Sequence, residues 1–188
     1  MGDAARDLRP REVPRLASLH APMLAYLQRT LPLFARAFAS RETALVSRIE
    51  RRVGVRDLDL YLHMNQAVYA QVIELGRADW FVRSGAFARW RRRDLTVAVA
   101  SQHIVYRREL RYGTRYVIDT RAVAMNGRLL VAQGHLIVGD RVHARADVEM
   151  IFKGPEGVLD AEAAADCCEG LLTPALEVED WTVAGTRD

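Results

Sequence analysis

Residues 56–67 gather polar side chains of the kinds that carry out chemistry. They read Arg-Asp-Leu-Asp-Leu-Tyr-Leu-His-Met-Asn-Gln-Ala and place Asp57 and Asp59 close to His63 and Asn65. The residues after Asn65 are mainly good helix formers, and asparagine is a preferred N-cap. The first N–H groups of a helix have no intrahelical partner and can polarise a carbonyl oxygen. A carboxylate beside them can act as base or nucleophile on that carbonyl group.

The same residue types also suit a purely structural turn. Aspartate and asparagine often cap helices and close turns without any further function. Taken by itself, this stretch favours that structural interpretation, so the functional hypothesis needs support from the rest of the chain.

That support comes first from a resemblance. The motif Asp-x-Asp-x-x-x-His-x-Asn at residues 57–65, with Ala67 and Tyr69, resembles the signature of the 4-hydroxybenzoyl-CoA thioesterase-like hotdog superfamily, which often reads Asp-x-Asp-x-x-Gly-His-Val-Asn-Asn. The longer string over residues 52–66 resembles the THEM-type members of that superfamily. The likeness continues through residues 100–110 and at Asp180-Trp181, and so covers most of the chain from about Arg48 onward.

The resemblance implies hydrolysis of an acyl thioester without a metal or redox cofactor, the CoA or phosphopantetheine arm being part of the substrate. It matches Asp59 to the catalytic aspartate, His63 to the motif histidine and Asn65 to the first asparagine of the helix. Some relatives place a catalytic glutamate on this helix, which makes Glu74 a second candidate acid or base. The structural alternative for Glu74 is an ion pair with a nearby arginine such as Arg77 or Arg83.

Further residues are candidates for substrate binding. The run Arg89-Trp90-Arg91-Arg92-Arg93 favours a solvated loop, but arginine forks also suit CoA phosphates, with Trp90 stacked on adenine. An anionic membrane surface is a third partner for this run. Ser101 and Gln102 occupy a strand expected to pass the helix terminus, where they could orient water. The complete predicted set of substrate-binding residues is Tyr61, Leu62, Met64, Tyr69, Ser101, Gln102, Arg91 and Arg92.

Three positions depart from the superfamily pattern and keep a second hypothesis open. Leu62 replaces the common glycine, Gln66 replaces the second asparagine, and Tyr61 stands where plant acyl-carrier-protein thioesterases carry a functional asparagine. A bulky Leu62 could narrow a backbone approach that glycine permits. The alternative function is therefore a non-catalytic acyl-thioester or lipid-binding protein. A hotdog hydratase is less attractive, because the chain lacks the Asp-x-x-x-x-His arrangement that such enzymes use.

Composition sets the broad class. A chain of 188 residues, 50% hydrophobic and 27% charged, is ordinary for a globular protein. The net charge of +3 suits anionic ligands without demanding nucleic acid, and no nucleic-acid motif is present. Cys167 and Cys168 are adjacent and cannot join distant parts of the chain by a disulfide bond, so we expect a reducing, cytoplasmic location. No pair of histidines has metal-ligand spacing.

Residues 1–41 are amphipathic, rich in arginine and broken by prolines. Their most apolar run is shorter than the roughly 20 residues that span a bilayer, so we expect contact with the domain, a partner subunit or the membrane surface.

The periodicity of the remaining chain predicts the fold. Residues 44–55 are predicted to form a strand with Val53 and Val55 on its apolar face. The helix after Asn65 is apolar around most of its circumference. Residues 95–106 are predicted to form a long strand. Asn126-Gly127 and Gly139-Asp140 then mark two tight turns of an antiparallel meander. This is an α+β chain with a curled antiparallel sheet around one helix, as in the hotdog fold.

We expect an N-terminal extension over 1–43, a hotdog domain over 44–155 and a C-terminal helix and tail over 156–188. The resemblance implies a homodimer or a dimer of dimers. The acyl group is carried either by CoA or by an acyl-carrier protein, which would then be a partner, and the sequence does not distinguish the two.

Overall fold

The computed structural model describes residues 43–178, and the predicted leader at 1–41 lies outside them. The described elements, in chain order, are β1 (Val46–Arg52), a 3₁₀ turn (Val55–Asp57), α2 (Gln66–Arg83), α3 (Ala86–Arg91), β2 (Thr96–Tyr106), β3 (Arg115–Asn126), β4 (Leu129–Val138), β5 (Arg141–Gly154), β6 (Gly157–Val158) and α4 (Ala161–Cys167). None of the described helices is long and apolar enough to cross a membrane.

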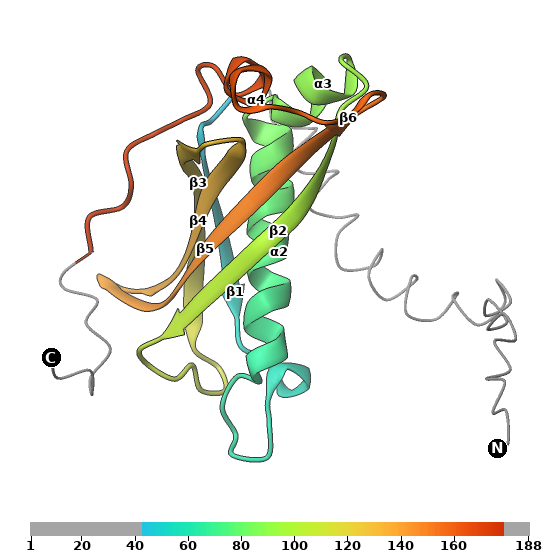
Figure 1. Ribbon diagram of the computed structural model, residues 1–188. Coiled ribbons are helices and arrows are strands. Elements are labelled where there is room, and N and C mark those ends of the chain that lie inside the picture. Colours follow the sequence, from blue (N-terminus) through green and yellow to red (C-terminus); the bar gives the residue numbers. More distant parts are fainter. Residues whose placement is uncertain (1–42, 179–188) are drawn as a thin grey trace, which may run out of the picture.

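One antiparallel sheet carries the whole structure. Its strand order is β1-β3-β4-β5-β2, and β6 pairs with β5. Figure 1 shows the sheet curling past α2, with the connection at residues 58–65 at the lower end of the helix and α3 and α4 near its upper end. The predicted hotdog architecture is confirmed, and the sheet continues through β6 past the expected boundary at residue 155.

Helix α2 starts and packs as its sequence predicts. Asn65 is the N-cap, and its side chain accepts a hydrogen bond from the Ala67 N–H at 2.8 Å. The helix contacts β1, β3 and β4. Its buried residues are Val68, Tyr69, Val72, Ile73, Leu75, Gly76, Asp79 and Trp80. Sequence reasoning missed the buried carboxylate of Asp79, which accepts hydrogen bonds from Ser47 at 2.5 Å and Arg83 at 2.7 Å.

Two details of the predicted elements are wrong. Val55 lies in the 3₁₀ turn rather than on the apolar face of β1, and its side chain is exposed. The arginine run at 89–93 belongs largely to α3 instead of a solvated loop. Trp90 is buried among Trp80, Phe81 and Phe152, and its Nε1–H donates to the Cys167 carbonyl at 3.0 Å. Trp90 therefore cannot stack on adenine, because aromatic packing holds it in the core.

The sheet face that points away from α2 contains buried polar groups. Asp119 is fully buried there and pairs with Arg48 at 2.9 Å and Arg121 at 2.7 Å. His135 lies opposite Asp119 on one side and Arg145 on the other. It is fully buried, and neither of its ring nitrogens has a hydrogen-bond partner among the described residues. Burial lowers the pKa of His135 from 6.5 to about 4, against the opposing effect of Asp119.

This shift predicts how stability depends on pH. Below pH 6.5 the unfolded chain binds a proton at His135 that the folded protein excludes. The contribution of neutral His135 to the free energy of unfolding is therefore complete above pH 6.5 and is lost as the pH falls toward 4. We expect His135 to remove about 2 kcal/mol from the free energy of unfolding between pH 7.5 and 5. Urea unfolding at both pH values should show a smaller loss for His135→Gln. Equal losses in the variant and the parent would contradict the prediction.

Candidate active site

The loop before α2 holds the Asp59 carboxylate in a fixed position. Asp59 Oδ1 accepts hydrogen bonds from the N–H groups of Tyr61 at 2.9 Å and His63 at 3.2 Å. The Asp59 N–H donates to the His63 carbonyl at 2.8 Å, and the Leu62 N–H donates to the Asp59 carbonyl at 3.1 Å. Asp59 therefore closes a tight turn, as the structural interpretation of the sequence expected, while its carboxylate remains at the entrance to the helix.

A second segment, the connection between β2 and β3, binds this loop. The Met64 N–H donates to the Leu110 carbonyl at 2.7 Å, and His63 forms an isolated β-bridge with Arg111. His63 Nε2 also lies 3.0 Å from a carboxylate oxygen of Glu109. Leu110 is fully buried and anchors the connection in the core. The position of the Asp59 loop thus depends on residues about 50 positions later in the sequence.

A cavity of about 410 Å³ opens beside this loop. Its lining residues are Asp59, Met64, Gln66, Tyr69, Tyr106, Arg107, Arg108 and Glu109. Three predicted site residues, Asp59, Met64 and Tyr69, therefore share one cavity. Carboxylates, guanidinium groups and aromatic rings line it together, so it offers both a base and cationic groups to an anionic ligand.

Two tyrosines form the aromatic part of the cavity wall. The rings of Tyr69 and Tyr106 meet edge to face with their centroids 5.0 Å apart. Burial raises the pKa of Tyr69 to about 12, although a backbone hydrogen bond from Leu110 opposes the rise. Its phenol is therefore protonated at neutral pH.

The first residue of α2, Gln66, lines the same cavity. The Ala67 N–H is bound by the Asn65 side chain, and the Val68 N–H donates to the Asn65 carbonyl at 2.9 Å. Within residues 43–178, the Gln66 N–H has no acceptor. Among the first three N–H groups of α2, the backbone N–H of Gln66 is therefore the one left to polarise a carbonyl oxygen bound in this cavity.

Tyr61 and Leu62 lie outside this cavity in the single chain. Their side chains are 81% and 68% exposed, and Leu60 beside them is 98% exposed. Leu62 adopts a φ of 61°, the left-handed conformation that glycine adopts readily. Leucine thus takes the backbone conformation open to the common glycine, and its side chain points to the surface instead of narrowing the site.

Three further predicted residues are not brought to the cavity within one chain. Ser101 lies in the exposed strand β2 and donates to Glu149 at 2.7 Å, and Gln102 is exposed next to it. Tyr106, at the end of the same strand, is the residue that reaches the cavity. Glu74 is half-buried on α2, and of its two expected arginine partners Arg83 pairs with Asp79.

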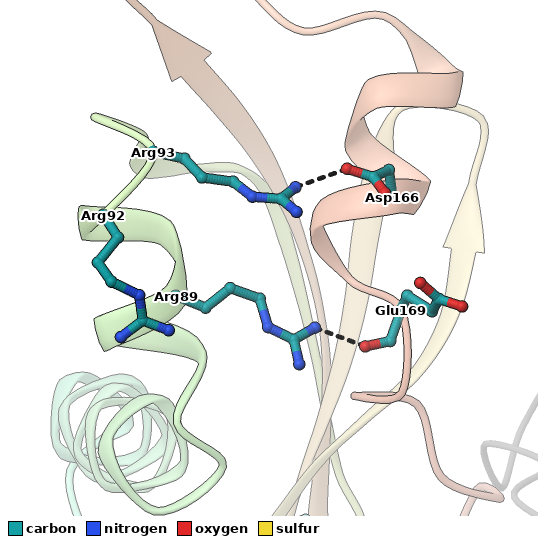
Figure 2. Close-up of a pocket in the computed structure, with 5 residues that line it drawn as sticks. All are labelled: Arg89, Arg92, Arg93, Asp166 and Glu169. Atoms are coloured by element: carbon teal, nitrogen blue, oxygen red, sulfur yellow. Dashed lines mark hydrogen bonds and ion pairs between the residues drawn. The ribbon is translucent and has the colours of Figure 1, made fainter.

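The predicted phosphate-binding arginines lie at the other end of α2. The helix has 18 residues, which separates its ends by about 27 Å. A cavity of about 590 Å³ there is lined by Arg89, Arg92, Arg93, Asp166 and Glu169 (Figure 2). Arg93 pairs with Asp166 at 2.6 Å, and Arg89 donates to the Glu169 carbonyl at 2.5 Å. Arg91 is exposed, and in the described part of the chain the Arg92 guanidinium has no hydrogen-bond or ion-pair partner, although its backbone N–H donates to the Ala88 carbonyl at 3.2 Å.

Sequence reasoning missed Glu109, Tyr106, Arg107 and Arg108 as site residues. Residues 107–110 carried part of the family resemblance but no role. Their signal is positional, because they follow the long strand at the end that reaches the start of α2. The pairing of β2 with β5 fixes this placement, and the motif does not predict the register of that pairing.

An antiparallel sheet curled past one long helix, with an aspartate in the loop that feeds the helix N-terminus, defines a hotdog domain with a candidate site for carbonyl chemistry. Residues 53–157 match the thioesterase-like superfamily, which is more than half of the chain. The protein therefore belongs to the thioesterase-like superfamily. No curated protein is significantly similar to the chain in sequence.

Solved structures share the fold at low sequence identity. The probable thioesterase YbaW from Escherichia coli is 20% identical, with a TM-score of 0.62, and the match covers 68% of this chain and 99% of that one. A mutant 4-hydroxybenzoyl CoA thioesterase complexed with 4-hydroxybenzoyl CoA is 13% identical, with a TM-score of 0.56 over 67% and 100% of the two chains. Slr0204, a 1,4-dihydroxy-2-naphthoyl-CoA thioesterase from Synechocystis, is 13% identical, with a TM-score of 0.53 over 66% and 97%.

Proposed function

We propose that the protein hydrolyses an acyl thioester to a free acid and a thiol. The observation that carries the proposal is the Asp59 carboxylate, held by two backbone N–H groups, in a cavity that is also lined by Gln66, the first residue of α2. Family membership and the CoA thioesterases among its structural relatives support the same reaction.

In the proposed mechanism the carbonyl oxygen of the substrate faces the Gln66 N–H. Asp59 removes a proton from water as the water oxygen attacks the carbonyl carbon, or attacks directly to form a mixed anhydride that water then opens. The C–S bond breaks, and the sulfur leaves as a thiolate that takes up a proton. His63 and Asn65 hold the loop and the helix start in place. The proposed reaction uses no metal or redox cofactor. The CoA or phosphopantetheine arm is part of the substrate.

The rival function is binding of an acyl thioester without turnover. The sequence favoured it through Tyr61, Leu62 and Gln66. The exposure of Tyr61 and Leu62 weakens that argument, because neither side chain fills the cavity. Free-thiol release from short, long and aromatic acyl-CoAs separates the two functions. Tight binding without release on any substrate would favour the binding protein, and release from an acyl-carrier protein alone would identify that partner.

We further propose a homodimer that pairs along β2. This strand has 11 residues and hydrogen-bonds to β5 on one side, and within residues 43–178 nothing pairs with its other edge. Long, exposed edge strands readily pair with a second chain. A partner subunit would also approach Ser101 and Gln102, and could bring its own Arg91 and Arg92 to this site.

The dimer gives a direct test at Val99, which is half-exposed in the middle of β2. We expect Val99→Lys to yield a monomer in light scattering, because the charge opposes close pairing of the two edges. Thr96→Lys at the start of the strand is the control and should stay dimeric. A dimeric Val99→Lys protein would exclude this pairing.

A further inference from the structure

Glu109 lines the same cavity as Asp59, yet the proposed hydrolysis gives it no role. Its Oε2 lies 3.0 Å from His63 Nε2. Its other oxygen, Oε1, accepts a hydrogen bond from Arg111 Nε at 2.7 Å, and the second contact of this fork comes from Arg111 Nη2. Two cationic or proton-donating groups thus offset the Glu109 charge, so it can lie near Asp59 without strong mutual repulsion.

His63 connects Glu109 to Asp59. The imidazole of His63 contacts Glu109, whereas its main chain contacts Asp59 on both sides. The His63 N–H donates to Asp59 Oδ1 at 3.2 Å, and the His63 carbonyl accepts from the Asp59 N–H at 2.8 Å. A group that fixes the His63 ring therefore also restricts the donor that orients the Asp59 carboxylate.

Glu109 is itself held by β5 and by the core. The N–H groups of Arg107 and Arg108 both donate to the His143 carbonyl, at 3.0 and 3.1 Å. His143 Nδ1 lies 3.2 Å from the Glu109 carbonyl, and the next residue, Leu110, is fully buried. The glutamate thus projects from an anchored segment toward a loop that is otherwise exposed at its tip.

We propose that Glu109 is a positioning residue for Asp59, acting through His63. This inference rests on the proposed thioester hydrolysis. The reacting carboxylate must lie within a fraction of an ångström of its productive place, and a displacement of about 1 Å can cost a factor of about 100 in rate. Glu109 limits such displacement by holding the ring of the residue whose N–H binds Asp59.

Kinetics of two Glu109 variants test the proposal. We expect Glu109→Ala to lower kcat about 10- to 100-fold with little change in KM, because substrate binding survives while the base is misplaced. Glu109→Gln should lose less, since its amide oxygen still accepts a hydrogen bond from His63 Nε2–H. Adding His63→Ala to Glu109→Ala should cost little more than either single change, as expected for residues that act as one unit. Asp147→Ala is the control and should keep the parental kcat; it breaks the similarly exposed Arg145–Asp147 pair at 2.8 Å and also removes the acceptor of the Gln133 Nε2–H at 2.9 Å.

A second measurement does not depend on turnover. Amide hydrogen exchange of Tyr61 and His63, whose N–H groups bind Asp59, should be faster in Glu109→Ala and parental in Asp147→Ala. If the parent protein releases no thiol from any substrate, the hydrolase proposal fails, and exchange alone decides whether Glu109 positions Asp59. Parental exchange in Glu109→Ala overturns the inference, as does a parental kcat in an active enzyme.

Discussion

Asp59→Asn is expected to abolish most thiol release from an acyl-CoA while leaving a folded protein that still binds the substrate. Asparagine can keep the hydrogen bonds from the Tyr61 and His63 amides, because its side-chain oxygen accepts as the carboxylate does. It can neither take a proton from water nor attack the carbonyl carbon. A positioned general base contributes about 10²- to 10⁴-fold, so we expect a loss of kcat in that range. Thiol detection under single-turnover and steady-state conditions measures the loss.

The other aspartate of the motif provides the control. Asp57 Oδ2 accepts a hydrogen bond from the Gly54 N–H at 2.8 Å and belongs to the 3₁₀ turn before the loop. Asp57→Asn keeps an oxygen at that position and should retain activity within a few-fold of the parent. If Asp59→Asn also keeps activity within a few-fold of the parent, Asp59 is ruled out as the base or nucleophile.

The sequence predicted those parts of the fold that local chemistry determines. Asn65 caps α2 because its side chain can accept from an N–H two residues later. The turns at Gly127 and Gly139 both have positive φ, which their Asn-Gly and Gly-Asp sequences favour. The alternation of apolar residues in β5 matches its burial, with Ala144, Ala146 and Val148 buried. Each of these signals lies within a few residues and needs no knowledge of distant contacts.

Features that depend on distant contacts were not predictable in the same way. A charge run gave no sign that Trp90 is core, because that burial depends on Phe152 from β5 and on the Cys167 carbonyl of α4. The charged residues of β3 alternate with apolar ones, as they do on a solvated strand face. Only the neighbouring strands show that Asp119 and His135 are buried there and how the Asp119 charge is paired.

The candidate site divides along the same line. The motif located Asp59, His63 and Asn65, since one loop and one helix start contain all three. Glu109 could not be found in this way, because its contact with His63 joins two segments 46 positions apart through an interaction that neither local sequence encodes. The local motif therefore predicts the part of this candidate site before α2, whereas the register of the strands determines which residues of the β2–β3 connection join it.

The last prediction concerns the close contact that places α2 against the sheet. Gly76 faces β3, and a Cβ atom added there would lie 2.3 Å from Thr120 Oγ1 and 2.7 Å from Ile118 Cγ2. Alanine has a higher helix propensity than glycine by about 1 kcal/mol, so an exposed site would be stabilised. Here we expect Gly76→Ala to destabilise the fold by about 3 kcal/mol, because overpacking forces the helix away from β3. Urea unfolding measures the change.

A second substitution shows whether overpacking is the cause. The Thr120 hydroxyl is buried without a hydrogen-bond partner among the described residues, so Thr120→Ala removes the nearest clashing atom and an unsatisfied polar group together. We expect the double variant Gly76→Ala/Thr120→Ala to recover at least about 1 kcal/mol relative to additivity, the coupling typical of residues in contact. A rise in stability for Gly76→Ala alone would mean that helix propensity outweighs the contact. Because Gln66 is the first residue of this helix, the packing at Gly76 also fixes where the Gln66 N–H lies, and in the proposed mechanism that N–H faces the carbonyl oxygen.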